Sequence, residues 1–287
     1  PILKGFGGII EDLEDSQMVL QTQLSMRHVT PFRSEVQSKL SQLSETADTL
    51  ERWVKVQMLW CSLESVFTGG DIAKQMPLEA KKFLKMDKDW AKIMNKAAET
   101  GSVVGCCGNE ILRNTLPILH SELEKCQKSL EGYLEQKRHK FPRFYFCSNP
   151  VLLQILSQGS DPLAVKPFYE KIFDSIDDVN HDRSDKYKIL DMMSLSGVDS
   201  EVVPLAKPVS AKGQVEDWLG VLEKEMQVTI KNLTESVAVD CYEKPLKEFV
   251  DIYCGQLALL GLQFTWTAQF QVALERCRTS KSVMTET

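Results

Sequence analysis

The sequence has no long run of apolar residues and no excess of basic ones. Its longest apolar candidate, Leu257 to Phe264, is far shorter than the roughly 20 residues that a membrane-spanning helix needs. The 34 Lys and Arg against 40 Asp and Glu give a formal net charge of -6, whereas a nucleic-acid-binding surface needs clustered positive charge. We therefore expect neither a membrane nor a nucleic acid as a partner.

The motifs of common catalytic centres are missing too. There is no Gly-Lys dipeptide, so the phosphate-binding G-x-x-x-x-G-K-[ST] loop is absent, and there is no H-E-x-x-H zinc motif or G-x-S-x-G nucleophile elbow. The glycine clusters at 69–70 and 105–108 lie between predicted helices and not after a strand, which favours helix-end loops over ligand loops. The chain itself is predicted to hold no catalytic residue, no cofactor and no metal, although a Ser/His/Asp set assembled from distant positions stays open.

Eight cysteines occur without any C-x-x-C pair, a pattern typical of a protein in a reducing compartment. The vicinal pair Cys106-Cys107 has no neighbour that would lower a thiol pKa, and we interpret both as small loop residues. The chain begins without Met and without the architecture of a signal peptide, which indicates a segment of a longer protein.

Apolar residues recur at helical spacing over three long stretches after a lead-in at 1–30. The pattern predicts a helix from Pro31 to Phe67, a second from about Leu78 to Thr100 closed by Gly101, and a third from about 112 to 140 with Pro117 near its start. The segment from Gly101 to Gly108 is predicted to be a loop. Short connections make the three helices antiparallel, so that residues 31–140 form a first helical bundle.

Residues 141–210 are more interrupted and predict a junction with short helices and a small β-hairpin. The candidate junction, hinge or ring-contact residues are Phe141, Pro142, Arg143, Phe144, Tyr145, Phe146, Pro150, Pro162 and Pro167. Pro142 stops the preceding helix, so the aromatic run is interpreted as a bundle junction that anchors an extended strand, with a ligand platform as the alternative. Asn149-Pro150 and Asp161-Pro162 each pair a capping residue with a first-turn proline, and the hairpin is placed at 189–193 and 201–205.

The last third, residues 211–287, returns to helix, with an apolar stripe from Val215 to Leu233, a further helical region from about Leu246 to Arg278 and a polar tail from Ser280. The predicted fold is therefore mainly α, an elongated array of long antiparallel helices in bundles with one small β-hairpin. The basic run Lys137 to Lys140 falls at a helix C-terminus, where it complements the helix dipole; contact with an acidic surface is the alternative.

Several of these motifs, taken in order, resemble the linker region of dynein heavy chains. The similarity runs from about Gln37 to Glu275 and rests on the stretches Trp53-Val54-Lys55-Val56-Gln57, Gln75-Met76-Pro77, Tyr133-Leu134-Glu135-Gln136-Lys137-Arg138, Phe141 to Phe146, Leu152 to Ser157, Gln214 to Leu219 and Trp266-Thr267. Ser148-Asn149 and Tyr242 to Pro245 are more similar to axonemal than to cytoplasmic chains. Two departures are Cys254, where the family pattern has proline, and the hairpin turn at 196–201.

The resemblance implies a mechanical lever that is N-terminal to a ring of AAA+ ATPase modules and remodelled by that ring. ATP and Mg would bind in the ring of the full-length motor and not in this segment. The implied partners are the AAA+ ring of the same heavy chain and, through the full-length protein, other dynein subunits and microtubules. The implied location is cytoplasmic and cytoskeletal, in the axoneme of a cilium or flagellum. Alternatives are a non-motor helical scaffold or tethering module and, less favoured, a freestanding helical enzyme.

Overall fold

The computed structural model describes residues 2–68, 70–194 and 201–277. Contacts divide the chain into two compact units, residues 1–136 (unit 1) and 137–287 (unit 2). The architecture is mainly helical with a small antiparallel sheet, so the predicted fold class is confirmed. The predicted tail from Ser280 and most of the predicted hairpin turn lie outside the described residues.

The regular elements among the described residues of unit 1 are all helices. Its elements are α1 (Phe6–Leu24), the 3-10 helix η1 (Arg27–Phe32), α2 (Arg33–Phe67), α3 (Asp71–Gln75), α4 (Pro77–Thr100), α5 (Val103–Cys107) and α6 (Glu110–Lys140), whose last residues belong to unit 2. The three long predicted helices correspond to α2, α4 and α6, and Pro117 lies within α6 without ending it. Gly101 closes α4 with a φ of 61°, a left-handed conformation that glycine adopts without steric cost.

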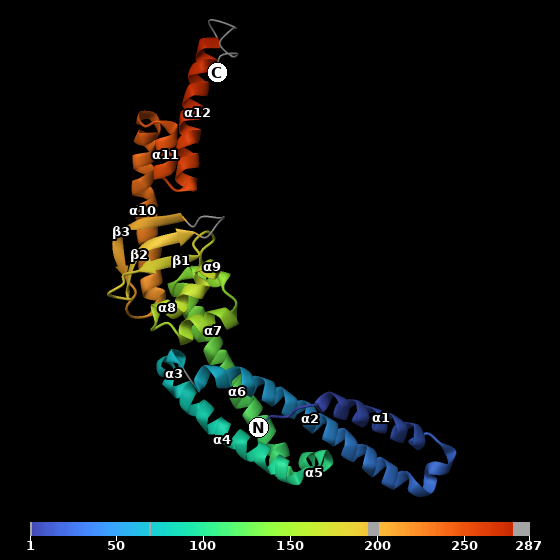
Figure 1. Cartoon of the computed structure of the whole chain (residues 1–287). Coiled ribbons are helices and arrows are strands. Elements are labelled where there is room, and N and C mark those ends of the chain that lie inside the picture. The colour runs from blue at the N-terminus through green and yellow to red at the C-terminus, as the bar shows by residue number, and fades with distance from the viewer. Residues whose placement is uncertain (1, 69, 195–200, 278–287) are drawn as a thin grey trace. The chain divides into compact units, whose positions relative to one another are not determined.

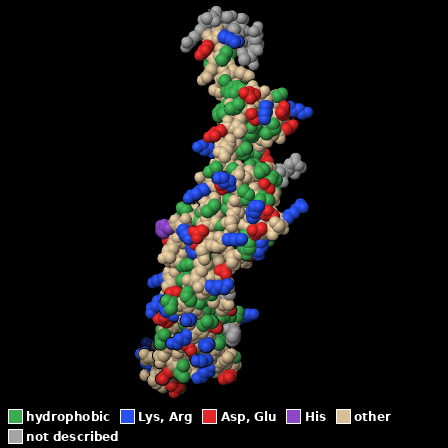
Figure 2. Space-filling view, turned by 90° about the vertical axis from the view of Figure 1, so that its left-hand side faces the viewer, with side chains coloured by type: hydrophobic (Ala, Val, Ile, Leu, Met, Phe, Trp, Pro, Cys, Tyr) green, Lys and Arg blue, Asp and Glu red, His purple; other side chains and the backbone are tan. Residues whose placement is uncertain are grey.

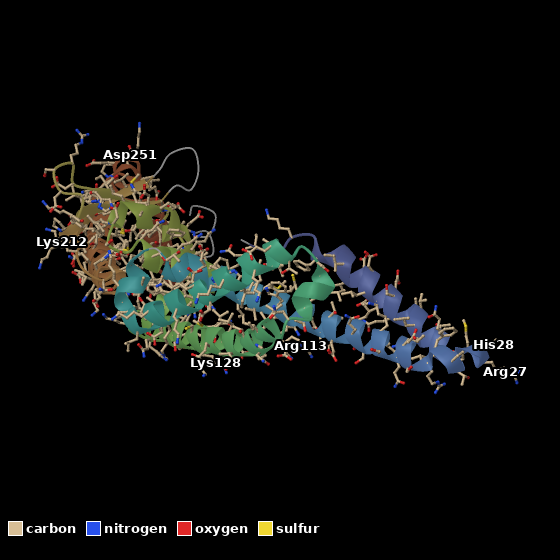
Figure 3. The ribbon with its side chains drawn as sticks, turned by 90° about the horizontal axis from the view of Figure 1, so that it is seen from below. Arg27, His28, Arg113, Lys128, Lys212 and Asp251 are labelled. Atoms are coloured by element: carbon tan, nitrogen blue, oxygen red, sulfur yellow. The ribbon has the colours of Figure 1, made fainter. Side chains whose placement is uncertain are left out.

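The segment predicted as a lead-in, residues 1–30, contains α1, which runs beside α2 and is joined to it by a turn that carries Arg27 and His28 (Figure 3). One sequence prediction for unit 1 is wrong: the predicted loop at 101–108 contains α5, which Ser102 caps by accepting a hydrogen bond from the Gly105 N–H at 3.3 Å.

Aromatic side chains hold α2 against α4. Trp60 stacks on Trp90 with ring centroids 5.5 Å apart, and its Nε1 donates a hydrogen bond to Asp87 at 3.1 Å. Phe67 stacks on Phe83 at 5.7 Å, and Phe83 and Trp90 are both buried. Since each aromatic side chain buries a large apolar area, this seam makes a large contribution to the core of unit 1.

Unit 2 combines short elements, a sheet and a helical hairpin (Figure 1). Its elements are η2 (Pro142–Phe146), α7 (Asn149–Ser157), α8 (Pro162–Val165), η3 (Lys166–Phe168), α9 (Tyr169–Ile172), β1 (Asp178–His181), β2 (Lys188–Ser194), β3 (Glu201–Ser210), α10 (Val215–Glu243), α11 (Leu246–Ile252) and α12 (Gly255–Cys277). The strands pair antiparallel in the order β1-β2-β3, so the predicted hairpin is present as β2 and β3 and a third strand adds to it.

Helix α10 supports both the sheet and the helices that follow. Thr229 Oγ1 accepts a hydrogen bond from the Ala206 N–H at 2.9 Å, and Glu225 accepts one from the Lys207 N–H at 2.8 Å, which attaches β3 to α10. Further along α10, Val237 joins an apolar cluster with Phe249 of α11 and Leu257 of α12. The predicted helical region after Leu246 is thus divided into α11 and α12 near Cys254.

Candidate functional site: the aromatic junction of unit 2

The candidate junction starts where α6 ends. Phe141 leaves the helix with φ -131° and ψ 93°, and Pro142 begins η2, which is a compact 3-10 turn and not the extended strand expected from the sequence. Two backbone bonds close the turn, from the Phe144 N–H to the Phe141 carbonyl at 3.0 Å and from the Cys147 N–H to the Phe144 carbonyl at 3.1 Å. The extended-strand interpretation failed because the residues after Pro142 satisfy one another's backbone groups locally.

The aromatic run divides into buried and exposed side chains. Phe141 and Phe144 are buried, with their rings edge to face at 5.0 Å and 83°, a favourable aromatic geometry. Tyr145 is 51% exposed and Phe146 is 75% exposed. The first two side chains therefore anchor the turn in unit 2, whereas the last two are accessible to a partner.

Arg138 ties the turn to the elements on either side of it. Its guanidinium donates to the Phe144 carbonyl at 3.4 Å, to the Cys147 carbonyl at 3.2 Å and to Asn149 Oδ1 at 2.7 Å. The fixed fork of an arginine suits several acceptors at once. Asn149 therefore binds Arg138, and the capping role predicted for its side chain is wrong.

Arg143 attaches the turn to α9 and α10. Its Nε donates to Glu223 at 2.7 Å, Nη1 donates to the Ile172 carbonyl at 3.5 Å, and the guanidinium lies 4.9 Å from the centroid of the Phe173 ring. A charge-assisted hydrogen bond combined with a cation–π contact fixes both the position and the orientation of the side chain.

Two lysines of the basic run reach the acidic first turn of α10. Lys137 binds Glu216 at 2.6 Å, while Lys140 lies 3.4 Å from Glu216 and 2.7 Å from Asp217. The hydrogen bond to Asp217 is the main cause of the raised pKa of Lys140. Glu216 is almost completely buried. For these two lysines the alternative prediction, contact with an acidic surface, is therefore the correct one, and that acidic surface is the first turn of α10 in the same chain.

The three remaining candidate prolines begin short helices close to this turn in sequence. Pro150 and Pro162 occupy the first turns of α7 and α8, and Asp161 caps α8 by accepting a hydrogen bond from the Leu163 N–H at 3.2 Å, as predicted. Pro167 lies in η3. Each proline fixes φ where an N–H would have no helical partner, which sets where these helices begin.

Sequence reasoning missed Glu216 and Glu223 as partners of the candidate residues. One signal was available, because the sequence places Glu216-Asp217 in the first turn of a predicted helix, where carboxylates complement the dipole and attract lysines. Glu223 follows seven residues later, two helical turns along the same face.

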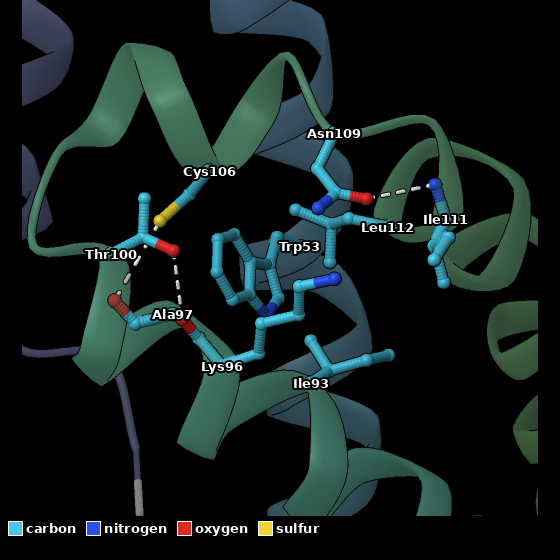
Figure 4. A pocket seen from close by; sticks show the side chains of 9 residues that line it. All are labelled: Trp53, Ile93, Lys96, Ala97, Thr100, Cys106, Asn109, Ile111 and Leu112. Atoms are coloured by element: carbon cyan, nitrogen blue, oxygen red, sulfur yellow. Dashed lines mark hydrogen bonds between the residues drawn. The ribbon is translucent and has the colours of Figure 1, made fainter.

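A small apolar hollow lies in unit 1, where α4 and α5 meet α2 and the start of α6 (Figure 4). Trp53 lies at its centre, Cys106 approaches the Ala97 carbonyl through sulfur at 3.7 Å, and the Ile111 N–H donates to Asn109 at 2.9 Å. Burial, and then the neighbouring Cys106, raise the pKa of Cys107 to about 11. A thiol with this pKa stays protonated near neutral pH, so Cys107 does not supply the thiolate that a redox pair needs.

Among residues 2–68, 70–194 and 201–277, no group of three His, Cys, Asp or Glu side chains is placed to hold a metal ion. None of the helices in the described part of the chain combines the length and the apolarity that crossing a membrane requires. The junction combines two buried aromatic side chains, Phe141 and Phe144, with two arginines that bind several acceptors and two exposed aromatic side chains, Tyr145 and Phe146.

The family model described as "Dynein heavy chain, N-terminal region 2" matches residues 1–237. The chain belongs to this dynein heavy chain family. The dynein gamma chain of the flagellar outer arm from Chlamydomonas reinhardtii is 44% identical over 96% of the chain. Dynein axonemal heavy chain 5 from Rattus norvegicus is 43% identical over 97% of it, and dynein axonemal heavy chain 8 from Mus musculus 43% over 99%.

The chain spans only 6–8% of the length of these dynein heavy chains. It is therefore similar to one region of much larger proteins. The resemblance to the dynein linker region, and to axonemal chains in particular, is confirmed by these matches.

Proposed function

We propose that the chain is a mechanical lever of an axonemal dynein heavy chain. ATP-driven changes in an adjoining AAA+ ring would remodel this lever and so generate the power stroke by which the motor moves along microtubules. ATP and Mg would bind in that ring, and the other dynein subunits would associate with the full-length protein in the axoneme of a cilium or flagellum. Membership of the dynein heavy chain family is the observation that carries the proposal.

The packing within each unit supports a lever. In unit 1 the aromatic seam between α2 and α4 joins two helices of 35 and 24 residues along their sides. Close-packed helices resist deformation and transmit strain, because their interiors have low compressibility. A bundle of this kind transmits force without absorbing it in local rearrangement.

The junction is the part of the chain that we assign to bending or ring contact, with Phe141 to Phe146, Pro150, Pro162 and Pro167 as its residues. A hinge needs a few element-terminal residues that absorb backbone changes, and this segment contains several short elements in succession. The exposed side chains of Tyr145 and Phe146 are the ones available to touch the ring.

Arg143→Ala in a heavy chain that contains this region tests the role of the junction. The change removes the link from η2 to Glu223 and the Phe173 ring. We expect ATP turnover to continue while microtubule gliding becomes slower, because force would be lost in a loosened junction. The assay compares gliding velocity with microtubule-stimulated ATP turnover in one preparation.

Lys171→Ala is the matched control, since it removes a cation of unit 2 whose pair with Glu170 is largely exposed and contributes little. It should leave both rates unchanged. If Arg143→Ala lowered gliding and ATP turnover in equal proportion, or changed neither, the coupling role of the junction would be refuted.

A further inference from the structure

Helix α4 carries a row of lysines along one face. Its members, here called the lysine stripe, follow one another at intervals of four, three, four and four residues: Lys81, Lys85, Lys88, Lys92 and Lys96. With 3.6 residues per turn this spacing keeps the five side chains in one line, about 22 Å long at 1.5 Å per residue. All five are exposed. Figure 2 shows blue Lys and Arg side chains and red carboxylates interspersed over the face that it draws.

Few carboxylates pair with the lysines of the stripe. Within the described part of the chain, Lys92 is its one member with an ion-pair partner, Asp89 at 3.2 Å. On α6, Glu122 is already bound by Lys125 at 2.6 Å. That hydrogen bond is the main cause of the lowered pKa of Glu122, and the charge of Lys85 adds to it. The chain is acidic as a whole, yet four of these five lysines have no ion-pair partner among the described residues.

Two classes of anionic partner fit this face poorly. An amphipathic helix that binds a membrane must insert its apolar face into the bilayer, but the apolar face of α4, with Phe83 and Trp90, is buried within unit 1. Lysines do bind the phosphates of nucleic acid, but the chain as a whole has a formal net charge of -6, so a polyanion that extends beyond this short stripe would be repelled. Beside the stripe lie two exposed aliphatic side chains, Leu78 and Leu84, which suit the side chains of a polypeptide.

We propose that the lysine stripe docks an acidic polypeptide segment of a partner protein. Alternate residues of an extended chain recur about every 6.6 Å, close to the roughly 6 Å between lysines four positions apart on a helix. A segment with Asp or Glu at every second position therefore places one carboxylate opposite each lysine. Apolar residues next to its carboxylates contact Leu78 and Leu84.

Binding of a fluorescent ten-residue poly-glutamate peptide to the 287-residue chain tests this inference. The variant Lys85→Gln/Lys88→Gln/Lys92→Gln removes the middle of the stripe, and glutamine keeps nearly the same helix propensity. The matched control, Lys128→Gln/Lys224→Gln/Lys247→Gln, removes the same charge from three exposed lysines elsewhere. Circular dichroism verifies that both variants fold.

The stripe variant should bind the peptide about ten-fold more weakly than the control variant, because each exposed charge contact contributes a few-fold. Salt should weaken binding to the unchanged chain, because exposed charge contacts are screened. Equal affinity of the two variants would overturn the proposal, since binding would then follow net charge. Stripe-dependent binding to phosphatidylserine vesicles or to duplex DNA, without binding to the peptide, would also overturn it.

Discussion

Gly261 of α12 faces the Phe249 ring so closely that a single methyl group has no room. A Cβ built on Gly261 would overlap Phe249 Cζ, with Cε1 of the ring at 2.9 Å and Cys241 Cβ at 3.2 Å. The ring is 2% exposed and belongs to the apolar cluster that holds α10, α11 and α12 together. Gly261→Ala is therefore an overpacking change in that cluster.

The expected magnitude follows from two opposing effects. Alanine in place of glycine stabilises a helix interior by about 0.5–1 kcal/mol, while overpacking a filled core costs about 1–3 kcal/mol. Gly261→Ala should thus lower the free energy of unfolding by about 0.5–2 kcal/mol. Gly220→Ala is the matched control, because Gly220 lies inside α10 with no atom within 4 Å of the place that a Cβ would take. The same change there should raise stability by about 0.5–1 kcal/mol.

Urea denaturation followed by circular dichroism measures the difference, with hydrogen exchange over residues 230–262 as a local measure, because a chain with two units need not unfold in one step. A double-mutant cycle isolates the cause. In a Phe249→Leu background the smaller side chain leaves space, so Gly261→Ala should no longer destabilise. The reasoning is refuted if Gly261→Ala is as stable as Gly220→Ala, or if Phe249→Leu does not relieve its effect.

Two further predictions concern ionic contacts of unit 2. Glu216→Ala should destabilise unit 2 by about 3 kcal/mol, because Lys137 loses a buried carboxylate at 2.6 Å. The double variant Glu216→Leu/Lys137→Met should recover most of this stability. Hydrogen exchange over residues 215–226 measures both effects, and a double variant as unstable as Glu216→Ala would contradict the reasoning. Hydrogen bonds from Lys244 and then Tyr253 lower the pKa of the Asp240 carboxyl. The stability that this carboxylate contributes is therefore fully present above about pH 4, the ordinary pKa of an aspartate in the unfolded chain. It is lost as the pH falls through the lowered pKa of the folded state. Asp240→Asn should therefore lower the urea midpoint at pH 6 but have a smaller effect at pH 3, and an equal effect at both pH values would exclude this role.

Periodicity predicted the long helices because their burial follows one repeating pattern. In α4, Phe83, Met86 and Trp90 recur at three and four residues and are all buried. The short element α5 was missed because its sequence, Val103 to Cys107, is too short for a period and lies among glycines. Strand β1 was missed because Asp178 to His181 is four residues long and mostly polar, so its pairing with β2 decides its conformation.

At the candidate site the sequence located the turn but not its contacts. Pro142 and the aromatic residues around it are local signals, and they correctly marked where α6 ends. The partners of Arg143 are Glu223, 80 positions later, and the Phe173 ring. Such pairings depend on how α9 and α10 fold back on η2, which no local pattern specifies.

The stack of Trp60 on Trp90 has a spectroscopic consequence. Two indole rings with centroids 5.5 Å apart and planes 23° apart couple their electronic transitions, and this coupling weakens steeply with separation. The near-ultraviolet circular dichroism of the chain should therefore contain a signal that reports the spacing of α2 and α4. Sliding of either helix by one turn would separate the two rings and erase that signal. The spectrum of the unlabelled chain therefore reports whether α2 and α4 keep their relative position.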